Sequence, residues 1–194
     1  MDSSTEVAIA VKRTPREALI SALSKLTQPL PSVGIQDRVV IKPSILDPEM
    51  PGNTSLEIVQ ATARLFEGSA EVLLAESDNP YRSVEDAYSK LDYTSLAKSK
   101  VRLFNLSTDK LEPMTLPGYY FQDSHLMPQV LKPPLYLINV ATLKYRPHES
   151  VIWGGIKNLF GLLPEVDRGP RAMPFGRRRS GPTKSFAGVG CLIS

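Results

Sequence analysis

The twelve residues from His148 to Leu159, HESVIWGGIKNL, are the densest group of chemically capable side chains in the sequence. They contain the only tryptophan, a glycine pair and Lys157, and Phe160-Gly161 follows directly. A glycine inside a helix costs about 1 kcal/mol relative to alanine, so a pair of them indicates a need for bare backbone. The segment therefore predicts a binding site for a small anionic ligand.

Lys157 is the first candidate for chemistry in this segment. A helix capped by Ser150 would place Lys157 beside Trp153, one turn back. Its core face would consist of Ile152, Ile156, Leu159 and Leu163. A lysine whose stem lies on an indole ring is attracted through the ring and partly shielded from water, which suits anion or carbonyl chemistry. The alternative is an ordinary solvated lysine on a helix.

His148 is the second catalytic candidate. It follows Pro147, so we expect it on a loop, where an imidazole can act as a general base. The alternative is a surface histidine held by a hydrogen bond. The other histidine, His125, lies far away in the sequence, and neither has a carboxylate partner at metal-ligand spacing. We therefore predict no metal site, and the sequence names no cofactor.

Polar residues also follow three predicted strands where each strand ends. In open α/β sheets, ligands bind beyond the carboxyl ends of the strands, so these residues are expected at one rim. The predicted ligand-binding residues are Lys42, Ser44, Glu76, Asn139, Lys144, Gly154, Gly155 and Asn158. Structural alternatives exist, because acids after a strand often cap the next helix and Lys42-Pro43 can simply end a strand. The glycine pair can also mark a close approach of two helices, since it matches no known phosphate-binding loop.

Apolar runs and helix signals alternate along the chain. Strands are predicted at 6–12, 38–42, 70–75, 101–106 and 135–140. Helices are predicted to begin at Thr14-Pro15-Arg16-Glu17 and at Thr54-Ser55-Leu56-Glu57, and a third covers 84–98. Prolines break the segment 109–134, where we expect an irregular or antiparallel insertion. The predicted fold class is α/β, with a mostly parallel sheet covered by helices.

Charge divides the chain into two parts. The 194 residues carry a formal net charge of +3, but residues 1–167 hold 17 basic and 20 acidic side chains. We predict a single α/β domain over 1–167 and a basic, Gly/Pro/Arg-rich disordered tail over 168–194. The acidic body argues against nucleic acid as a partner. No apolar run approaches the roughly 18 residues of a membrane span, and no secretory signal is seen, so a cytoplasmic location is expected.

A lone cysteine, Cys191, lies in the tail. It excludes an internal disulfide and an iron–sulfur cluster. The last four residues, Cys191-Leu192-Ile193-Ser194, fit a prenylation pattern, and the arginines upstream would supply a basic membrane signal. The competing interpretation is that the sequence after Gly169 is a truncated or out-of-frame ending.

The string Gly155-Ile156-Lys157-Asn158-Leu159-Phe160-Gly161-Leu162 resembles the family of domain of unknown function 362. Ile41-Lys42-Pro43, Glu76-Ser77 and the stretch from Asn139 through Lys144 to His148 share the likeness, which spans about residues 6–167. The family is distantly similar to the N-terminal part of lactate racemases. That likeness implies that Lys157 holds a ligand or cofactor and that His148 transfers protons.

Two hypotheses from different classes follow. In the first, the domain is an enzyme or enzyme-derived module that binds a small anionic or nucleotide-like ligand around the GGIKNLFG segment. In the second, it is a non-catalytic, truncated relative that acts on a partner or a membrane through its basic tail. The first predicts that Lys157→Ala abolishes ligand binding, and the second that removing 169–194 abolishes function.

Overall fold

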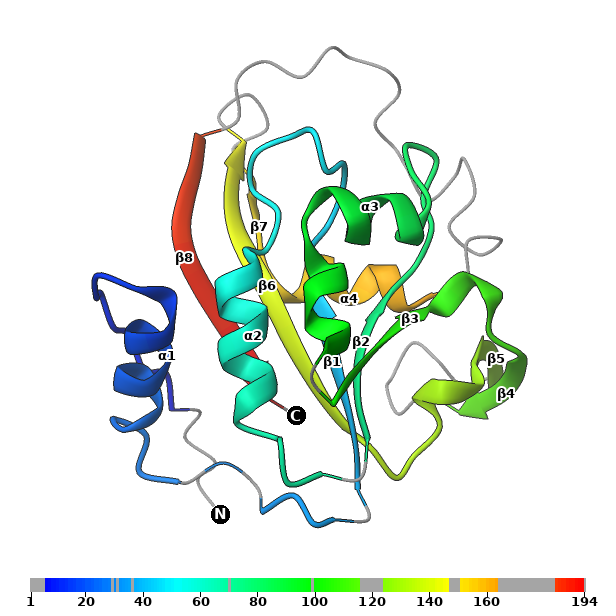
Figure 1. Ribbon diagram of the computed structural model, residues 1–194, viewed down its shortest axis with the longest axis horizontal. Coiled ribbons are helices and arrows are strands. Elements are labelled where there is room, and N and C mark those ends of the chain that lie inside the picture. Colours follow the sequence, from blue (N-terminus) through cyan, green and yellow to red (C-terminus); the bar gives the residue numbers. More distant parts are fainter. Residues whose placement is uncertain are drawn as a thin grey trace.

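A six-stranded sheet forms the centre of the molecule (Figure 1). Four strands are parallel, in the order β3-β2-β1-β6. Their bounds are Arg38–Pro43 (β1), Glu71–Glu76 (β2), Val101–Asn105 (β3) and Tyr136–Arg146 (β6). Two further strands, β7 (Val151–Trp153) and β8 (Lys184–Ile193), both pair antiparallel with β6. The computed structural model describes residues 6–28, 30, 32–35, 37–69, 71–98, 100–115, 124–146, 151–163 and 184–193.

Helices and an antiparallel hairpin surround this sheet. The α-helices are Pro15–Leu23 (α1), Leu56–Arg64 (α2), Val84–Lys90 (α3) and Gly155–Leu159 (α4). Short 3₁₀ helices cover Tyr93–Lys98, Leu106–Thr108, Gln129–Leu131 and Phe160–Leu162. The hairpin consists of β4 (Leu111–Thr115) and β5 (Ser124–Pro128). Figure 1 shows α2 and α3 in front of the sheet and α4 behind it.

The two faces of the sheet carry separate apolar cores, because successive side chains of a strand point to opposite faces. On the face covered by α1, α2 and α3, the core includes Leu19, Val39, Ile41, Ile58 and Leu74. On the other face it includes Val40, Leu73, Met127, Val130 and Leu162. A sheet buried on both faces requires strands with apolar centres, and residues 39–41 in β1 and 72–75 in β2 meet that requirement.

The predicted fold class is confirmed, including the antiparallel insertion, which is the β4–β5 hairpin. The capping box at the start of α1 is also present, with Thr14 and Glu17 bonded reciprocally. At α2, however, Ser55 is the N-cap residue, and the Thr54 hydroxyl instead donates to the Val140 carbonyl in β6. Thr54 therefore ties the loop after β1 to the sheet.

The strand predicted at 6–12 is wrong. Residues 6–12 form no strand, and Val7, Ile9 and Val11 are all at least 75 % exposed. An alternating apolar pattern forms a strand only where a sheet edge receives its backbone, and residues 6–12 pair with no strand in the described part of the chain. The segment is instead held to the end of α1, where Lys25 donates to the Ile9 carbonyl at 2.5 Å.

The ending of the chain also differs from the expectation of disorder. Residues Lys184–Ile193 form β8, whose backbone pairs with β6 from Ile138 to Tyr145. Residues 164–183 and 194 lie outside the described part of the chain. The strand forms on the edge of β6 opposite β1, since Ile138, Asn139 and Val140 pair with both strands.

Glu71, the first residue of β2, leads to a prediction about how stability depends on pH. Glu71 accepts hydrogen bonds from Arg38 at 2.8 Å and from Arg102 at 2.6 Å. Partial burial alone would raise the pKa of the Glu71 carboxyl, but these bonds outweigh it and lower the pKa below the ordinary 4.5. A lowered pKa in the folded state stabilises the fold above pH 4.5, and that contribution is lost as the pH falls through the folded-state pKa.

We therefore expect Glu71→Gln to be less stable than the wild type at pH 7, by no more than about 1 kcal/mol because the pair is partly exposed. The gap should close as the pH falls below about 4.5. Urea unfolding at pH 7, 5, 4 and 3 measures it, with Glu67→Gln, at an exposed position just before β2, as the control. A gap that widens on acidification would contradict the assignment.

Candidate functional site

A buried ion pair lies at the carboxyl ends of β1 and β2. The Lys42 ammonium donates to Glu76 Oε2 at 2.8 Å, and the two residues are 1 % and 2 % exposed. The ammonium also donates to the Pro43 carbonyl at 2.8 Å. Adjacent parallel strands bring the two residues together because β1 and β2 end at the same edge. The cost of desolvating both charges is offset only by this dense bonding.

Asn158 of α4 joins this pair to β6. Its side-chain oxygen accepts from Lys42 Nζ at 3.3 Å, and its amide nitrogen donates to the Lys42 carbonyl at 3.2 Å and to Asn139 Oδ1 at 2.8 Å. Asn139 in turn donates to the Gly155 carbonyl at 2.8 Å. We call Lys42, Glu76, Asn139 and Asn158 the edge network. It connects three strands of the sheet to the short helix α4.

The surroundings of Gly161 explain why a glycine follows α4. A Cβ atom on Gly161 would lie 3.2 Å from Lys42 Nζ and 3.3 Å from Glu76 Oε1. Both contacts are tight, and neither partner is free to move because each is buried and bonded. The Gly161 carbonyl also accepts from the Ser77 hydroxyl at 2.7 Å. The chain therefore passes directly over the ion pair, which requires a residue without a side chain.

Arg82 and two tyrosines surround Glu76. Arg82, which is also buried, donates to the Ser77 and Ile45 carbonyls and approaches Glu76 Oε2 at 3.9 Å. Burial raises the pKa of the Tyr88 and Tyr93 hydroxyls, and the charge of Glu76 adds to both shifts. The tyrosines therefore stay neutral donors, Tyr88 to the Leu74 carbonyl and Tyr93 to the Thr54 carbonyl. These three residues lie at loop and helix positions that carry no distinctive sequence pattern, so they were not among the predicted site residues.

Ser44 and Lys144 form a second contact at the same edge. The half-buried Lys144 donates to Ser44 Oγ at 3.2 Å. Its stem packs on Gly52, where φ is +92° and a Cβ would lie 3.0 Å from Lys144 Cε. Only glycine suits this position, since both the backbone angle and the space exclude a side chain. A cation and a hydroxyl are thereby held together.

Lys157 stands apart from the edge network. Its side chain is exposed, and the ammonium lies 5.1 Å from the ring centroid of Trp153 and 5.3 Å from that of Phe160. The predicted lysine–tryptophan contact is therefore present. In the β6–β7 ladder, Trp153 is the backbone partner of Lys144.

The helix predicted to start at Ser150 is wrong in its first turn. Val151–Trp153 form β7, and α4 begins only at Gly155. The predicted core face fails with it, because Ile152 is 65 % exposed and Ile156 is 86 % exposed. Spacing of apolar residues favoured a helix, but the free edge of β6 draws the β-branched residues into a hairpin.

Three further residues singled out in the sequence, Gly154, His148 and Cys191, do not belong to the edge network. Gly154 packs closely on β6, where a Cβ would lie 3.3 Å from Leu143 Cδ1. His148 lies outside the described residues. The backbone of Cys191 pairs with Val140 in the β6–β8 ladder. The catalytic and ligand-binding roles assigned from sequence remain predictions.

The described part of the chain shows neither a metal-binding cluster nor a membrane-spanning helix. Within these ranges, no group of three or more His, Cys, Asp or Glu side chains is arranged to hold a metal ion. Across the same residues, no helix has the length and apolar character needed to cross a bilayer.

Together, the parallel sheet and the edge network define an α/β domain with its polar cluster at the carboxyl edge of the strands. The model of the family described as "Domain of unknown function (DUF362)" matches residues 39–185. The chain belongs to this family, as the GIKNLFG segment predicted. Neither the search of curated proteins nor the search of solved structures gave a match.

Proposed function

We propose that the domain binds a small anionic, nucleotide-like ligand at the carboxyl edge of its parallel sheet. Ser44, Lys144 and Lys157 would contact the ligand, and the edge network would hold these contacts in place. The observation that carries the proposal is the convergence of Lys42, Glu76 and Asn139, from three adjacent strands, on one residue of the GIKNLFG segment.

The edge network supports this proposal because it is a costly way to hold a helix. Replacing a buried ion pair by apolar residues is often neutral or stabilising, so stability alone does not account for a buried lysine. Buried polar clusters at the carboxyl edge of α/β sheets are typical of functional sites. The network would fix α4 and thus set the position of Lys157 relative to Trp153.

The backbone of Gly154 and Gly155 is the proposed cradle for part of the ligand, because glycine allows a ligand to approach the main chain closely. His148 follows β6 in the sequence and is the proposed acid–base group of the same site. Lys144 and Lys157 would supply two positive charges to an anion, and a charge-assisted hydrogen bond is about twice as strong as a neutral one.

The single tryptophan provides a direct test, because Trp153 lies under the Lys157 ammonium. We expect pyrophosphate or AMP to change tryptophan fluorescence saturably. Lys157→Ala and Lys144→Ala should each weaken binding about tenfold or more, the loss expected from one charge-assisted hydrogen bond. Lys110→Ala, in the exposed Lys110–Glu112 pair, serves as the matched control.

Saturable binding that is equal in the wild type and in Lys157→Ala would refute the role of this lysine. A flat titration with both anions would refute the ligand class. Mass spectrometry of the intact protein as purified adds an independent measurement, because a retained cofactor would appear as added mass.

A further inference from the structure

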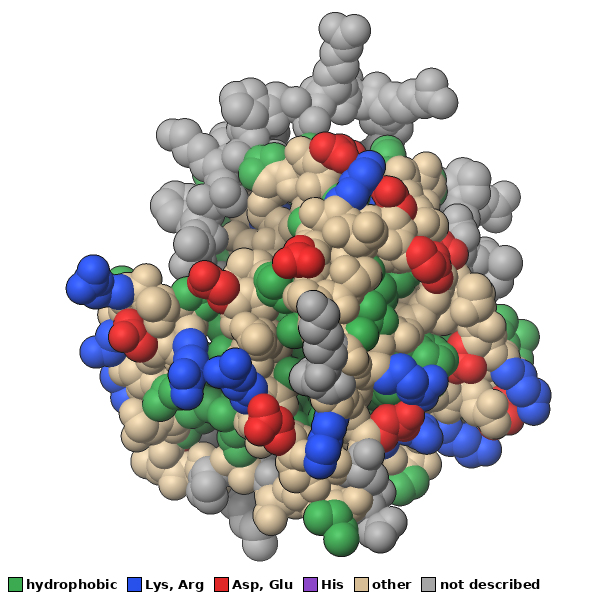
Figure 2. Space-filling model, viewed as in Figure 1, with side chains coloured by type: hydrophobic (Ala, Val, Ile, Leu, Met, Phe, Trp, Pro, Cys, Tyr) green, Lys and Arg blue, Asp and Glu red, His purple; other side chains and the backbone are tan. Residues whose placement is uncertain are grey.

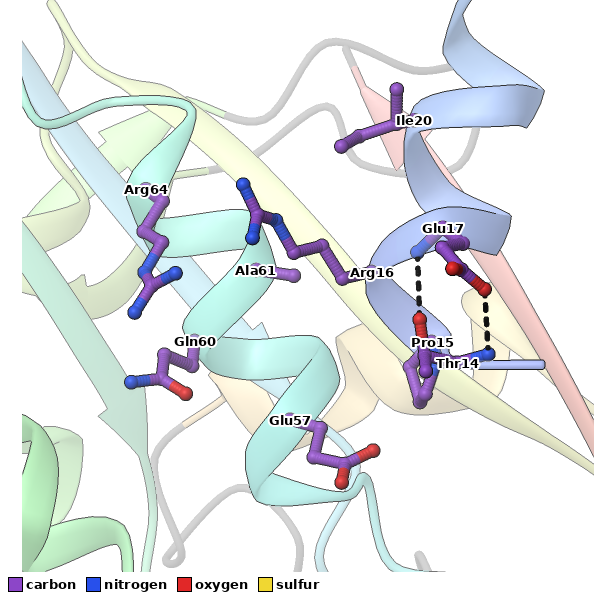
Figure 3. A pocket seen from close by; sticks show the side chains of 9 residues that line it. All are labelled: Thr14, Pro15, Arg16, Glu17, Ile20, Glu57, Gln60, Ala61 and Arg64. Atoms are coloured by element: carbon purple, nitrogen blue, oxygen red, sulfur yellow. Dashed lines mark hydrogen bonds between the residues drawn. The ribbon is translucent and has the colours of Figure 1, made fainter. Parts of the chain in front are cut away.

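A hollow of about 440 Å³ opens between α1 and α2, away from the edge network. Figure 3 shows its lining, with Arg16 reaching from α1 over Ala61 and with Arg64 and Gln60 extending from α2. Both arginines line the hollow, with the Arg16 side chain extending toward α2 and the Arg64 guanidinium lying beside the Gln60 side chain. In Figure 2, basic side chains lie side by side on the surface where α1 meets α2. The hollow is thus bordered by positive charge from two helices.

The two acids near this hollow do not neutralise the arginines. The Glu17 carboxylate is turned back to Thr14, where it accepts from the backbone N–H at 3.2 Å and completes the capping box. Glu57 lies at the opposite end, two turns or about 10 Å along α2 from Arg64. Among the described residues, no carboxylate lies within 4.0 Å of either guanidinium as an ion pair.

Two like charges that share a hollow repel each other unless an anion lies between them. Two guanidinium forks present several N–H donors, which match the three oxygens and the charge of −1.5 to −2 of a phosphate monoester at about pH 7 better than the two oxygens and single charge of a carboxylate. The Gln60 amide adds a neutral donor or acceptor beside them. The donors therefore favour phosphate.

Apolar surface lies beside the guanidinium groups. Pro15, Ala61 and the half-exposed Ile20 line the same hollow. This surface is too large for an inorganic ion and suits a ligand with an organic part attached to its anionic group.

We propose that this hollow is a second binding site, for the phosphate monoester of a small organic molecule. Arg16 and Arg64 bind the phosphate group, and Pro15, Ile20 and Ala61 contact the organic part. The site is independent of the ligand proposed at the carboxyl edge, since none of its residues belongs to that edge.

Isothermal titration calorimetry with phenyl phosphate tests the proposal on the full chain. The titration uses a Lys144→Ala/Lys157→Ala background, so that binding at the carboxyl edge does not contribute. We expect saturable binding of phenyl phosphate that Arg16→Ala and Arg64→Ala each weaken about tenfold or more. Arg13→Ala, which removes an exposed arginine just before α1, is the matched control and should bind as its parent does.

Two comparisons identify the chemical group. Benzoate should bind about tenfold more weakly than phenyl phosphate, and inorganic phosphate should also bind more weakly because it lacks the apolar part. The affinity for phenyl phosphate should fall between pH 7.5 and pH 5, since the second pKa of a phosphate monoester is about 6. Equal affinities in Arg16→Ala, Arg64→Ala and their parent would overturn the site, and benzoate binding as tight as phenyl phosphate would overturn the ligand class.

Discussion

Replacing Glu76 by glutamine lowers the free energy of unfolding by about 3–5 kcal/mol, the loss expected when one partner of a buried ion pair is removed. Lys42, 1 % exposed, would keep an ammonium group in the interior without its carboxylate. Burial favours the neutral form of a lysine, so the variant would either bury an uncompensated charge or deprotonate it. Urea unfolding at pH 7, with the change in midpoint and in slope analysed separately, measures the loss.

Two further variants separate this explanation from a general intolerance of the position. Lys42→Met combined with Glu76→Gln should lose less than the sum of the single losses, because neither partner is then left alone. Glu112→Gln, in an exposed pair with Lys110 and Lys132, should change stability far less than Glu76→Gln. Equal losses in Glu76→Gln and Glu112→Gln would show that burial does not govern the pair.

The centre of the fold is predictable because its signals are local and repeated. The run of residues 39–41 is apolar on both faces, which is typical of a strand covered on both sides. The capping sequence before α1 specifies the start of that helix from four neighbouring residues. Neither inference needs knowledge of what the segment packs against.

Strands at the edge of the sheet were missed or misplaced because their formation depends on a distant partner. In residues 6–12, large apolar side chains recur at every second position as in a strand, yet no sheet edge receives the segment. β7 has three residues, too few to show a period of two, and it forms because β6 runs past β1. A pattern within one segment cannot report which edges the rest of the chain leaves open.

Part of the candidate site follows from topology. Lys42, Glu76 and Asn139 were expected together because parallel strands end at one edge, and the edge network contains all three. Arg82 and Thr54 were not expected, since each occupies a loop position that only the folded chain brings to the edge. Lys157 lies outside the edge network, with its exposed side chain over the ring of Trp153.

Asn158 is the residue of the GIKNLFG segment that the edge network needs most. It makes bonds to both ends of Lys42 and to Asn139 with a single amide. An aspartate there could accept from the Lys42 ammonium but could not donate to two oxygens. The asparagine therefore couples the position of α4 to the ion pair.

We expect Asn158→Ala to lower the free energy of unfolding by about 2–6 kcal/mol, because the Lys42 carbonyl and Asn139 Oδ1 would each lose a buried donor at about 1–3 kcal/mol. Asn158→Asp should restore little of this loss, since it regains only the acceptor. The exposed neighbour Lys157→Ala should leave stability nearly unchanged while it weakens anion binding. Urea unfolding and the Trp153 fluorescence titration, carried out on the same three variants, distinguish a residue that holds α4 in place from a residue that contacts the ligand. Full stability in Asn158→Ala would mean that α4 is held by packing alone, and the edge network would then have no part in positioning Lys157.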